Sequence, residues 1–304
     1  MAAFVAAGFT AFDCADIYTG VEELIGRFRR EHPDLARRVR VHTKFVPDLD
    51  RLDRTDGPAV EAIVDRSLRR LGQERLDLVQ FHWWDYTVPR YVEVALELER
   101  LRRKGKIDRI GITNFGTPQL RELLDAGVPL SSHQLQYSLL DDRPRHGMVE
   151  LCRERGIALL CYGTIAGGFL SERWLGVPAP EHPLANRSLV KYRLVIDEFG
   201  GWPLFQLLLQ ALAAVAARHG CDVASVATRM MLDRPGVAAA IVGATSTAHL
   251  AAHQRIGTLE LDEADRAVIE AVTAQRRGPS GDVYELERDR DGPHGRIMKY
   301  TLNR

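Results

Sequence analysis

Short apolar runs alternate along the chain with longer segments in which apolar residues recur every three or four positions. Short runs rich in branched side chains predict strands, and the longer spacing predicts helices that bury one face. The predicted strands cover residues 9–13, 38–44, 76–82, 108–113, 132–136, 157–162 and 237–243. A predicted helix follows each of them, so the pattern is a repeated strand-then-helix unit.

Start and stop signals define the predicted helices. Asp56 and Pro58 open a helix whose apolar stripe includes Val60 and Val64, and Gly72 closes it. Other helices are predicted over 21–30, from 91 to the stop at Gly105, from the Thr117-Pro118 pair onward, over 146–155 and 203–219, and between Asp222 and Pro235, with two more that run to about residue 274. We interpret residues 163–202 as a long insertion.

Regular alternation with nearly continuous apolar strands predicts a parallel sheet that is buried on both faces. Seven units favour a (β/α)8 TIM barrel over an open sheet, and no GxGxxG follows a predicted strand. We expect a barrel truncated at its N-terminal side to about seven strands, because seven strands are predicted and only eight residues precede the first of them. The predicted division is a catalytic barrel over 1–275 and a tail over 276–304 that packs on or near it, with a substitute strand at 296–302 as an alternative.

Composition narrows the possible partners and compartments. Lys plus Arg and Asp plus Glu both number 41, so the formal net charge is zero and we expect no nucleic-acid or membrane partner. The four cysteines show no CxxC spacing, so we expect no metal site and a cytoplasmic location. The start of the chain lacks the pattern of a signal peptide. Nothing in the sequence indicates the oligomeric state.

Polar side chains stand where several predicted strands end. Asp13, Lys44 and His82 end the first three predicted strands. Tyr18 lies five residues after Asp13, just before the helix predicted over 21–30. In a parallel barrel these ends share one face, which is where active sites form. Taken singly, each has a structural alternative: Asp13 as a loop cap, Lys44 as a surface lysine and His82 as a core histidine. Taken together at successive strand ends, they favour a proton-transfer site.

The chemistry of such a set is specific. A phenol has a pKa of about 10 and donates its proton poorly at neutral pH. An ammonium about 4 Å away contributes roughly 4 kcal/mol at an effective dielectric constant near 20 and lowers that pKa. A carboxylate beside the ammonium keeps it charged, and an imidazole can orient a carbonyl oxygen.

The segment GFTAFDCADIY at 8–18 resembles the aldo-keto reductase pattern GxxxFDTAxxYG. Further blocks that are similar to the family follow in order over residues 8–274: HTKF, DLVQFHWWD, KIDRIGITNF, HQLQYSLL, CYGTIAGGFL and AIVGATSTAHLAAH. This resemblance implies reduction of an aldehyde or ketone by NADP(H), or the reverse oxidation of an alcohol. It implies that Tyr18 is the general acid, that Asp13 and Lys44 tune it, and that His82 orients the substrate.

The resemblance also implies a cofactor site. The nicotinamide end would be held by Thr113, Asn114 and Gln134 and would stack on Tyr162. The pyrophosphate would be covered by the loop residues Gly163, Thr164, Ile165, Gly168 and Leu170. The adenosine end would be surrounded by Gly243, Thr245, Ser246, His249 and His253. Thr245 and His249 stand where many relatives have Arg. We therefore expect NADPH to be preferred over NADH by a modest ratio only.

Other functions stay open at this point. One alternative is a cofactor-binding regulatory subunit or an inactive truncated reductase, and another is a Schiff-base aldolase that uses Lys44. Arg143 and Arg145 near the expected substrate mouth would suit an acidic substrate, but we interpret them as a solvated helix start. Aromatic residues such as Trp83 and Phe169 either line a substrate pocket or pack in the core.

Overall fold

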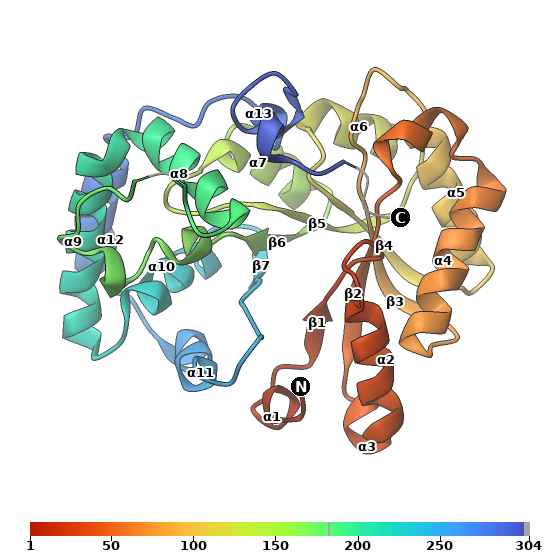
Figure 1. Cartoon of the computed structure of the whole chain (residues 1–304), viewed down its shortest axis with the longest axis horizontal. Coiled ribbons are helices and arrows are strands. Elements are labelled where there is room, and N and C mark those ends of the chain that lie inside the picture. The colour runs from red at the N-terminus through yellow and green to blue at the C-terminus, as the bar shows by residue number, and fades with distance from the viewer. Residues whose placement is uncertain (182, 301–304) are drawn as a thin grey trace. The chain divides into compact units, whose positions relative to one another are not determined.

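The computed structural model describes residues 1–181 and 183–300, and its strands follow the predicted order (Figure 1). The strands are β1 (Ala11–Asp13), β2 (Arg40–Phe45), β3 (Leu76–Phe81), β4 (Ile107–Thr113), β5 (Leu130–Gln136), β6 (Ala158–Tyr162) and β7 (Val237–Ala240). They are hydrogen-bonded neighbours in sequence order. Each of the seven strands in the described residues lies at a predicted position, within three residues at either end.

The helices fill the connections between the strands. The α-helices are α1 (Ala2–Ala6), α2 (Val21–Glu31), α3 (Pro33–Ala36), α4 (Gly57–Leu71), α5 (Tyr91–Arg103), α6 (Thr117–Asp125), α7 (Met148–Glu154), α8 (Arg187–Phe199), α9 (Gly201–His219), α10 (Val223–Leu232), α11 (Leu250–Thr258), α12 (Glu263–Thr273) and α13 (Glu285–Arg288). The 3-10 helices are η1 (Leu49–Arg54), η2 (Arg143–Arg145), η3 (Ala166–Gly168), η4 (Glu172–Trp174) and η5 (Gly295–Ile297).

The residues that the sequence indicates as helix caps form caps in the structure. The Asp56 side chain accepts a hydrogen bond from the Ala59 amide at 2.9 Å, which satisfies one of the amides exposed at the start of α4. Gly72 ends the same helix with a φ of 62°, a left-handed conformation that glycine adopts without steric cost. Asp222 caps α10 in the same way as Asp56, through the Ser225 amide at 2.7 Å.

The structure differs from the sequence interpretation in two segments. The insertion over 163–202 contains a helix that was not predicted, α8, which begins after Asn186, whose side chain accepts from the Leu189 amide. The alternative strand over 296–302 does not form in residues 296–300, where η5 ends and an irregular segment follows. The last two residues of that predicted strand, 301 and 302, lie outside the described residues.

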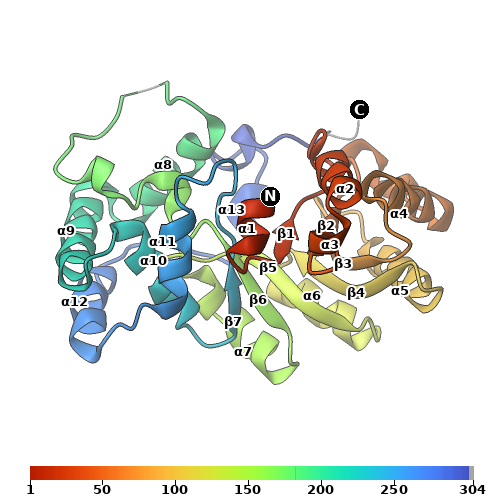
Figure 2. The same cartoon turned by 90° about the horizontal axis from the view of Figure 1, so that it is seen from below.

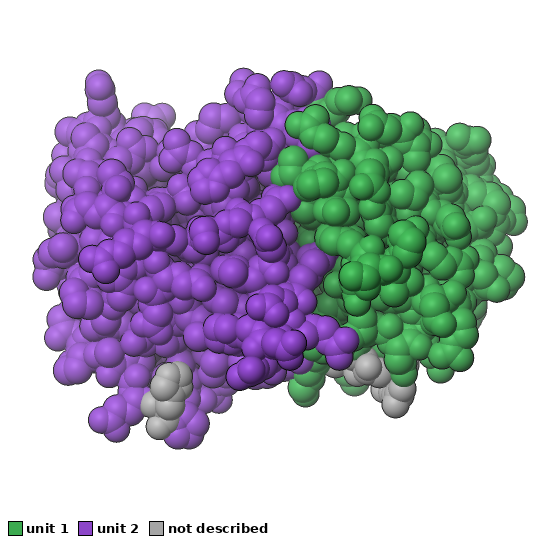
Figure 3. Space-filling view, turned by 90° about the horizontal axis from the view of Figure 1, so that it is seen from above, with its two compact units in different colours: residues 1–134, 155–158, 299–304 green, residues 135–154, 159–298 purple. Residues whose placement is uncertain are grey.

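The chain divides into two compact units (Figure 3). Unit 1 comprises the described residues of 1–134, 155–158 and 299–304, and unit 2 comprises those of 135–154 and 159–298. The predicted division into a barrel over 1–275 and a tail over 276–304 stays a prediction. In the described part of the chain no single helix is long and apolar enough to cross a membrane, and α8 and α9 pass that test only as a pair bent by 94°.

Unit 1 places its strands in a register that aligns polar side chains. Lys44 on β2 pairs with Gln80 on β3, and Gln80 pairs with Gly111 on β4. A side chain at Gly111 would not fit, because its Cβ would lie 2.3 Å from the Ser132 hydroxyl oxygen. The helices α2, α4 and α5 accompany these strands, with α4 packed between the other two (Figures 1 and 2).

Unit 2 is built around apolar helices. α9 packs against α8, α10 and α12, and it buries Phe205, Leu208 and Leu212 completely. Phe169 lies in this core and contacts the rings of Trp174 and Trp202. The packing interpretation of Phe169 is therefore confirmed, since its ring has no exposed surface.

Candidate active site

Asp13 collects hydrogen bonds from three other residues at the ends of strands in unit 1. Lys44 Nζ donates to Asp13 Oδ2 at 2.6 Å. Gln80 Nε2 and Gln134 Nε2 donate to Asp13 Oδ1 at 3.0 and 2.7 Å. Parallel strands end at one edge of a sheet, so the register of β1, β2, β3 and β5 brings these groups together. The structure brings Asp13 and Lys44 together, as the predicted strand ends indicate, and it adds Gln80 and Gln134 as donors to the same carboxylate.

The Lys44 ammonium is buried, and it is held as a cation. It also donates to the Cys14 carbonyl oxygen at 2.9 Å. Burial works against its charge, but the neighbouring Asp13 carboxylate and Tyr18 outweigh burial and raise the pKa of Lys44 above its usual value. Lys44 therefore carries a fixed positive charge at neutral pH.

Tyr18 lies in the loop between β1 and α2 and keeps 46% of its surface exposed. The Lys44 ammonium lies 5.3 Å from the centre of the Tyr18 ring, on its face. The Tyr18 amide donates to the Ala15 carbonyl oxygen at 3.1 Å, so a turn in the loop orients the residue. An exposed phenol beside a buried cation is accessible to a substrate and is placed for proton donation.

His82 is buried directly after β3. Its Nδ1 lies 3.1 Å from the Thr113 carbonyl oxygen, an acceptor, so Nδ1 carries the proton of that hydrogen bond. The ring meets the edge of Trp84 at a centroid distance of 4.3 Å. A neutral ring in this tautomer has a lone pair at Nε2. His82 can therefore donate to a substrate oxygen only when the ring carries both protons.

Thr113 and Asn114 end β4 beside Gln134. The Asn114 amide donates to the Gln134 carbonyl oxygen at 3.0 Å. Asn114 has a φ of +61°, a left-handed conformation that few residues other than glycine adopt. Such conformations concentrate at functional sites, where the surrounding structure holds them. Asn114 and Gln134, which the sequence also indicates, are therefore neighbours joined through their backbones.

The remaining predicted cofactor residues form a second set, in unit 2. The loop after Tyr162 turns through left-handed conformations at Gly163, Ala166, Gly167 and Gly168. A Cβ at Gly163 would lie 2.4 Å from the Tyr192 hydroxyl oxygen of α8, so only glycine fits there. The Thr164 hydroxyl contacts that of Thr228 at 3.3 Å, and Leu170 is fully buried. Ile165 accepts hydrogen bonds from the Gly168 and Leu170 amides.

The residues after β7 are exposed. Gly243, Thr245, Ser246 and His249 lie on the surface before α11. The His253 ring nitrogen Nε2 lies 3.2 Å from the Gly243 carbonyl oxygen. These contacts order the segment locally.

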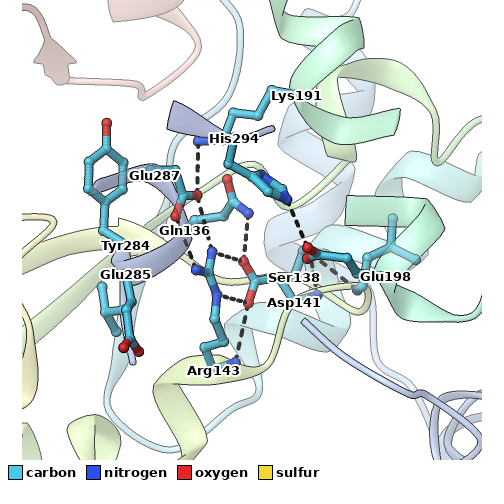
Figure 4. A network of polar contacts seen from close by, with 12 residues as sticks. Gln136, Ser138, Asp141, Arg143, Lys191, Glu198, Tyr284, Glu285, Glu287 and His294 are labelled. Atoms are coloured by element: carbon cyan, nitrogen blue, oxygen red, sulfur yellow. Dashed lines mark hydrogen bonds and ion pairs between the residues drawn. The ribbon is translucent and has the colours of Figure 1, made fainter. Parts of the chain in front are cut away.

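Arg143 contradicts our interpretation of a solvated helix start. It is 2% exposed, and it donates to Asp141 at 2.8 Å and to Glu287 at 3.0 Å (Figure 4). Burial favours a neutral carboxyl, but Arg143 and Lys191 outweigh it and lower the pKa of Glu287 to about 2. The solvated interpretation holds for Arg145, whose side chain is 55% exposed.

Lys191 of α8 is a residue that the sequence interpretation missed. Its ammonium lies 5.1 Å from the centre of the Tyr162 ring and 3.8 Å from Glu287. The sequence signal that could have placed Lys191 on a helix is the helical spacing of the apolar residues of α8, which include Tyr192, Val195 and Phe199. Gln80 was also missed, although a glutamine inside an apolar strand is a recognisable signal.

Two further expectations concern metals and aromatic side chains. Among the described residues, no group of three or more His, Cys, Asp or Glu side chains could hold a metal ion. Trp83 is fully buried, and its Nε1 donates to the Asp85 and Val88 carbonyl oxygens. The core interpretation of Trp83 is therefore confirmed.

Comparison with known proteins places these residues in context. The family model described as the aldo/keto reductase family matches residues 1–274. Flagellar radial spoke protein 5 of Chlamydomonas reinhardtii is 28% identical over 257 residues, which are 72% of this chain and 49% of that protein. Chloroplastic pyridoxal reductase of Arabidopsis thaliana is 33% identical over 236 residues, which are 72% of this chain and 61% of that protein. The chain thus spans about half to three-fifths of the length of these relatives.

Solved structures share the fold. The glycerol dehydrogenase AKR11B4 from Gluconobacter oxydans aligns with a TM-score of 0.76 and 22% identity, covering 92% of this chain and 86% of that one. An aldo-keto reductase from Klebsiella pneumoniae in complex with NADPH aligns with a TM-score of 0.68 at 22% identity and the same coverage. The predicted barrel class is confirmed by these likenesses, together with the ordered parallel strands.

Proposed function

Because this chain belongs to the aldo/keto reductase family, we propose that it transfers a hydride between a nicotinamide cofactor and an aldehyde or ketone, or the corresponding alcohol. The observation that carries this proposal is the stacking of the Lys44 ammonium, paired with Asp13 at 2.6 Å, on the exposed phenol ring of Tyr18. This arrangement supplies a proton donor, a fixed cation and an anchor for the cation.

The proton step follows from the charges. As the carbonyl carbon accepts a hydride, negative charge develops on the carbonyl oxygen. The Tyr18 hydroxyl gives its proton to that oxygen, and the O–H bond of the phenol breaks as the alcohol O–H bond forms. The phenolate that remains is stabilised by the Lys44 cation, because the Asp13 carboxylate holds the ammonium in place. His82 would orient the carbonyl oxygen.

The chain's residues fit a nicotinamide cofactor. When bound, this group supplies the hydride. We propose that Thr113, Asn114 and Gln134 hold its carboxamide, since a backbone hydrogen bond from Asn114 to Gln134 keeps these residues together at the ends of β4 and β5. Tyr162 would stack on the ring, and the glycine-rich loop over 163–170 would cover the pyrophosphate. Residues 243–253 would contact the adenosine end, where an exposed segment precedes α11.

We propose NADPH over NADH as the preferred cofactor, by a modest ratio. Thr245 and His249 present no permanent positive charge to a 2′-phosphate. Arg255, a nearby residue with a permanent charge, donates one of its five N–H groups to the Gly220 carbonyl oxygen at 2.5 Å. We also propose a cytoplasmic location, which the buried free thiols of Cys14, Cys152 and Cys161 support.

The Schiff-base alternative is disfavoured by the charge on Lys44. Formation of a Schiff base needs a neutral amine, and enzymes that use one lower the pKa of the lysine. Here the Asp13 carboxylate raises the pKa of Lys44 despite its burial. The ammonium is therefore suited to stabilise a phenolate and not to attack a carbonyl carbon.

A panel of aldehydes and ketones, assayed with NADPH and with NADH, tests the proposal. We expect turnover of at least one carbonyl compound by the wild type and its loss in Tyr18→Phe. Cofactor binding without turnover of any carbonyl compound would favour the alternative of a regulatory subunit. The likeness to a radial spoke protein is the observation that supports this alternative. Failure to bind either cofactor would contradict both.

A further inference from the structure

The Lys191 ammonium lies on three tyrosine rings in unit 2, and none of the roles proposed above uses it. Its Nζ lies 5.1 Å from the centre of the Tyr162 ring, 5.7 Å from that of Tyr192 and 5.8 Å from that of Tyr284. All three distances are within the range of about 6 Å in which the face of an aromatic ring attracts a cation. The Lys191 side chain is only 15% exposed, so these rings replace most of the water around its charge.

Two glycines allow α8 to approach the loop that follows Tyr162. A Cβ at Gly163 would lie 2.4 Å from the Tyr192 hydroxyl oxygen, and a Cβ at Gly167 would lie 2.7 Å from Tyr192 Cδ2. Any larger residue at either position would force α8 and the loop apart. Because both positions are glycine, α8 lies directly against this loop, with Lys191 beside the ring that would stack on the nicotinamide.

The helix α13 supplies a counter-ion that compensates Lys191 only in part. Glu287 lies 3.8 Å from the Lys191 ammonium, but its two carboxylate oxygens already accept hydrogen bonds from Arg143 at 3.0 and 3.1 Å (Figure 4). Burial lowers the pKa of Lys191, and the Glu287 carboxylate opposes this effect. A carboxylate and three ring faces together form an environment that suits an ammonium ion.

The charge of a nicotinamide ring depends on its redox state. The oxidised ring is a cation, and the reduced ring is neutral. A ring stacked on Tyr162 has its centre about 4.5–7 Å from that of the tyrosine, so it lies within about 12 Å of the Lys191 ammonium. At about 10 Å and an effective dielectric constant near 20, repulsion between two unit charges changes a binding constant on the order of tenfold. The Glu287 carboxylate reduces this effect.

We propose that Lys191 makes the cofactor site discriminate between the two redox forms: its ammonium on Tyr162 repels the cationic oxidised nicotinamide and does not oppose the neutral reduced ring. In a mixture of both forms the chain is therefore loaded with the reduced cofactor. Lys191 acts through space and through the Tyr162 ring, as a specificity-determining residue. This inference rests on the proposed function, because it requires a nicotinamide at Tyr162.

Two neutral variants of Lys191 and one matched control test the proposal. Lys191→Met and Lys191→Gln both remove the charge and keep an unbranched side chain. The control is Arg193→Met, on the same helix. The Arg193 side chain is 16% exposed, and its guanidinium lies 5.3 Å from the centre of the Trp202 ring, so it is an equally buried cation on a different aromatic ring.

The readout is the ratio of the dissociation constants of NADP⁺ and NADPH, measured by isothermal titration at pH 7. The ratio should fall about threefold to tenfold in both Lys191 variants, because NADP⁺ binds more tightly once the cation is removed. It should stay within about twofold of the wild type in Arg193→Met. A third ligand, 2′-phospho-ADP-ribose, has the same phosphates but no nicotinamide. Its affinity should be the same in the wild type and in the Lys191 variants.

The outcomes separate this inference from the proposed function. An unchanged ratio in the Lys191 variants, with both cofactors still bound, would overturn the inference and leave the proposed reductase standing. Equal loss of affinity for all three ligands would overturn it as well, because Lys191 would then bind phosphate. A fall in Lys191→Met alone would assign the effect to packing and not to charge.

Activity is not needed for a positive result. The expected fall in the ratio, in a chain whose wild type reduces no carbonyl compound, would support the inference and contradict the proposed reductase. Binding of neither cofactor by the wild type would contradict both.

Discussion

Gln134 Nε2 donates a 2.7 Å hydrogen bond to Asp13 Oδ1, although the two residues are 121 positions apart in the sequence. The same carboxylate accepts from Lys44 and Gln80. One acidic side chain therefore fixes donors from three other strands. Its bond to Lys44 holds the ammonium that lies on the Tyr18 ring, and the predictions about turnover depend on that position.

Tyr18→Phe should lower kcat for carbonyl reduction by about 10²- to 10⁴-fold, which is the range for loss of a general acid. The phenylalanine ring keeps the contact with Lys44, so the affinity for the cofactor should stay nearly unchanged. Steady-state kinetics and fluorescence titration with NADPH measure the two quantities. Wild-type turnover in this variant would refute the assignment of Tyr18.

Lys44→Met should lower kcat for carbonyl reduction, because the phenolate that Tyr18 leaves after proton donation loses the cation that stabilises it. The matched control is Lys106→Met. Lys106 pairs with Asp65 at 2.6 Å, as Lys44 does with Asp13, but directly before β4. If Lys44→Met keeps the wild-type kcat, as Lys106→Met should, Lys44 does not assist the proton donor.

Glu287→Gln should destabilise the fold by about 3–5 kcal/mol at pH 7, because it removes one partner of a buried ion pair and leaves Arg143 undercompensated. Urea unfolding measures this change. Glu285→Gln in the same helix is the control, since Glu285 is exposed. A loss below 1 kcal/mol would mean that Asp141 alone compensates Arg143.

The lowered pKa of Glu287 predicts how the free energy of unfolding changes in acid. Arg143 and Lys191 lower the pKa of Glu287 to about 2 from its ordinary 4.5, against the effect of burial. The folded state therefore binds this proton less readily than the unfolded state. The stabilisation is complete above about pH 4.5 and is lost as the pH falls toward 2. Glu287→Gln should lack this loss, so its free energy of unfolding should depend less on pH over that interval.

The cofactor preference is open to direct titration. Isothermal titration should show tighter binding of NADPH than of NADH by a modest factor, on the order of tenfold or less, which corresponds to about 1.4 kcal/mol. The reason is that Thr245 and His249 offer no permanent charge to the 2′-phosphate. Tighter binding of NADH would overturn this preference.

The sequence indicated the strands and one half of the candidate site for a physical reason. Apolar runs buried on both faces are recognisable locally, and parallel strands end at a common edge, so Asp13 and Lys44 follow from local pattern and topology alone. The helix α8 carried an equally clear signal in its Asn186 cap and its apolar spacing. It was missed because the surrounding segment contains no strand to mark the next unit.

Other features depend on partners that are distant in the sequence. Arg143 and Arg145 lie in one short polar run, yet the first is buried and the second is half exposed. Arg143 is buried because it pairs with Glu287, and no sequence pattern near residue 143 indicates that partner.

The pairing of Arg143 with Glu287 affects how unit 2 can fold while the chain is being synthesised. The two residues are 144 positions apart, and at 5–20 residues per second the ribosome needs roughly 7–30 s to travel from one to the other. During that time the nascent Arg143 has only Asp141 as a counter-ion. A guanidinium in this state keeps its hydration and resists being enclosed. Unit 2 should therefore stay open to chaperones and proteases until α13 has been synthesised, and a stalled ribosome short of residue 287 should leave a chain that is readily degraded.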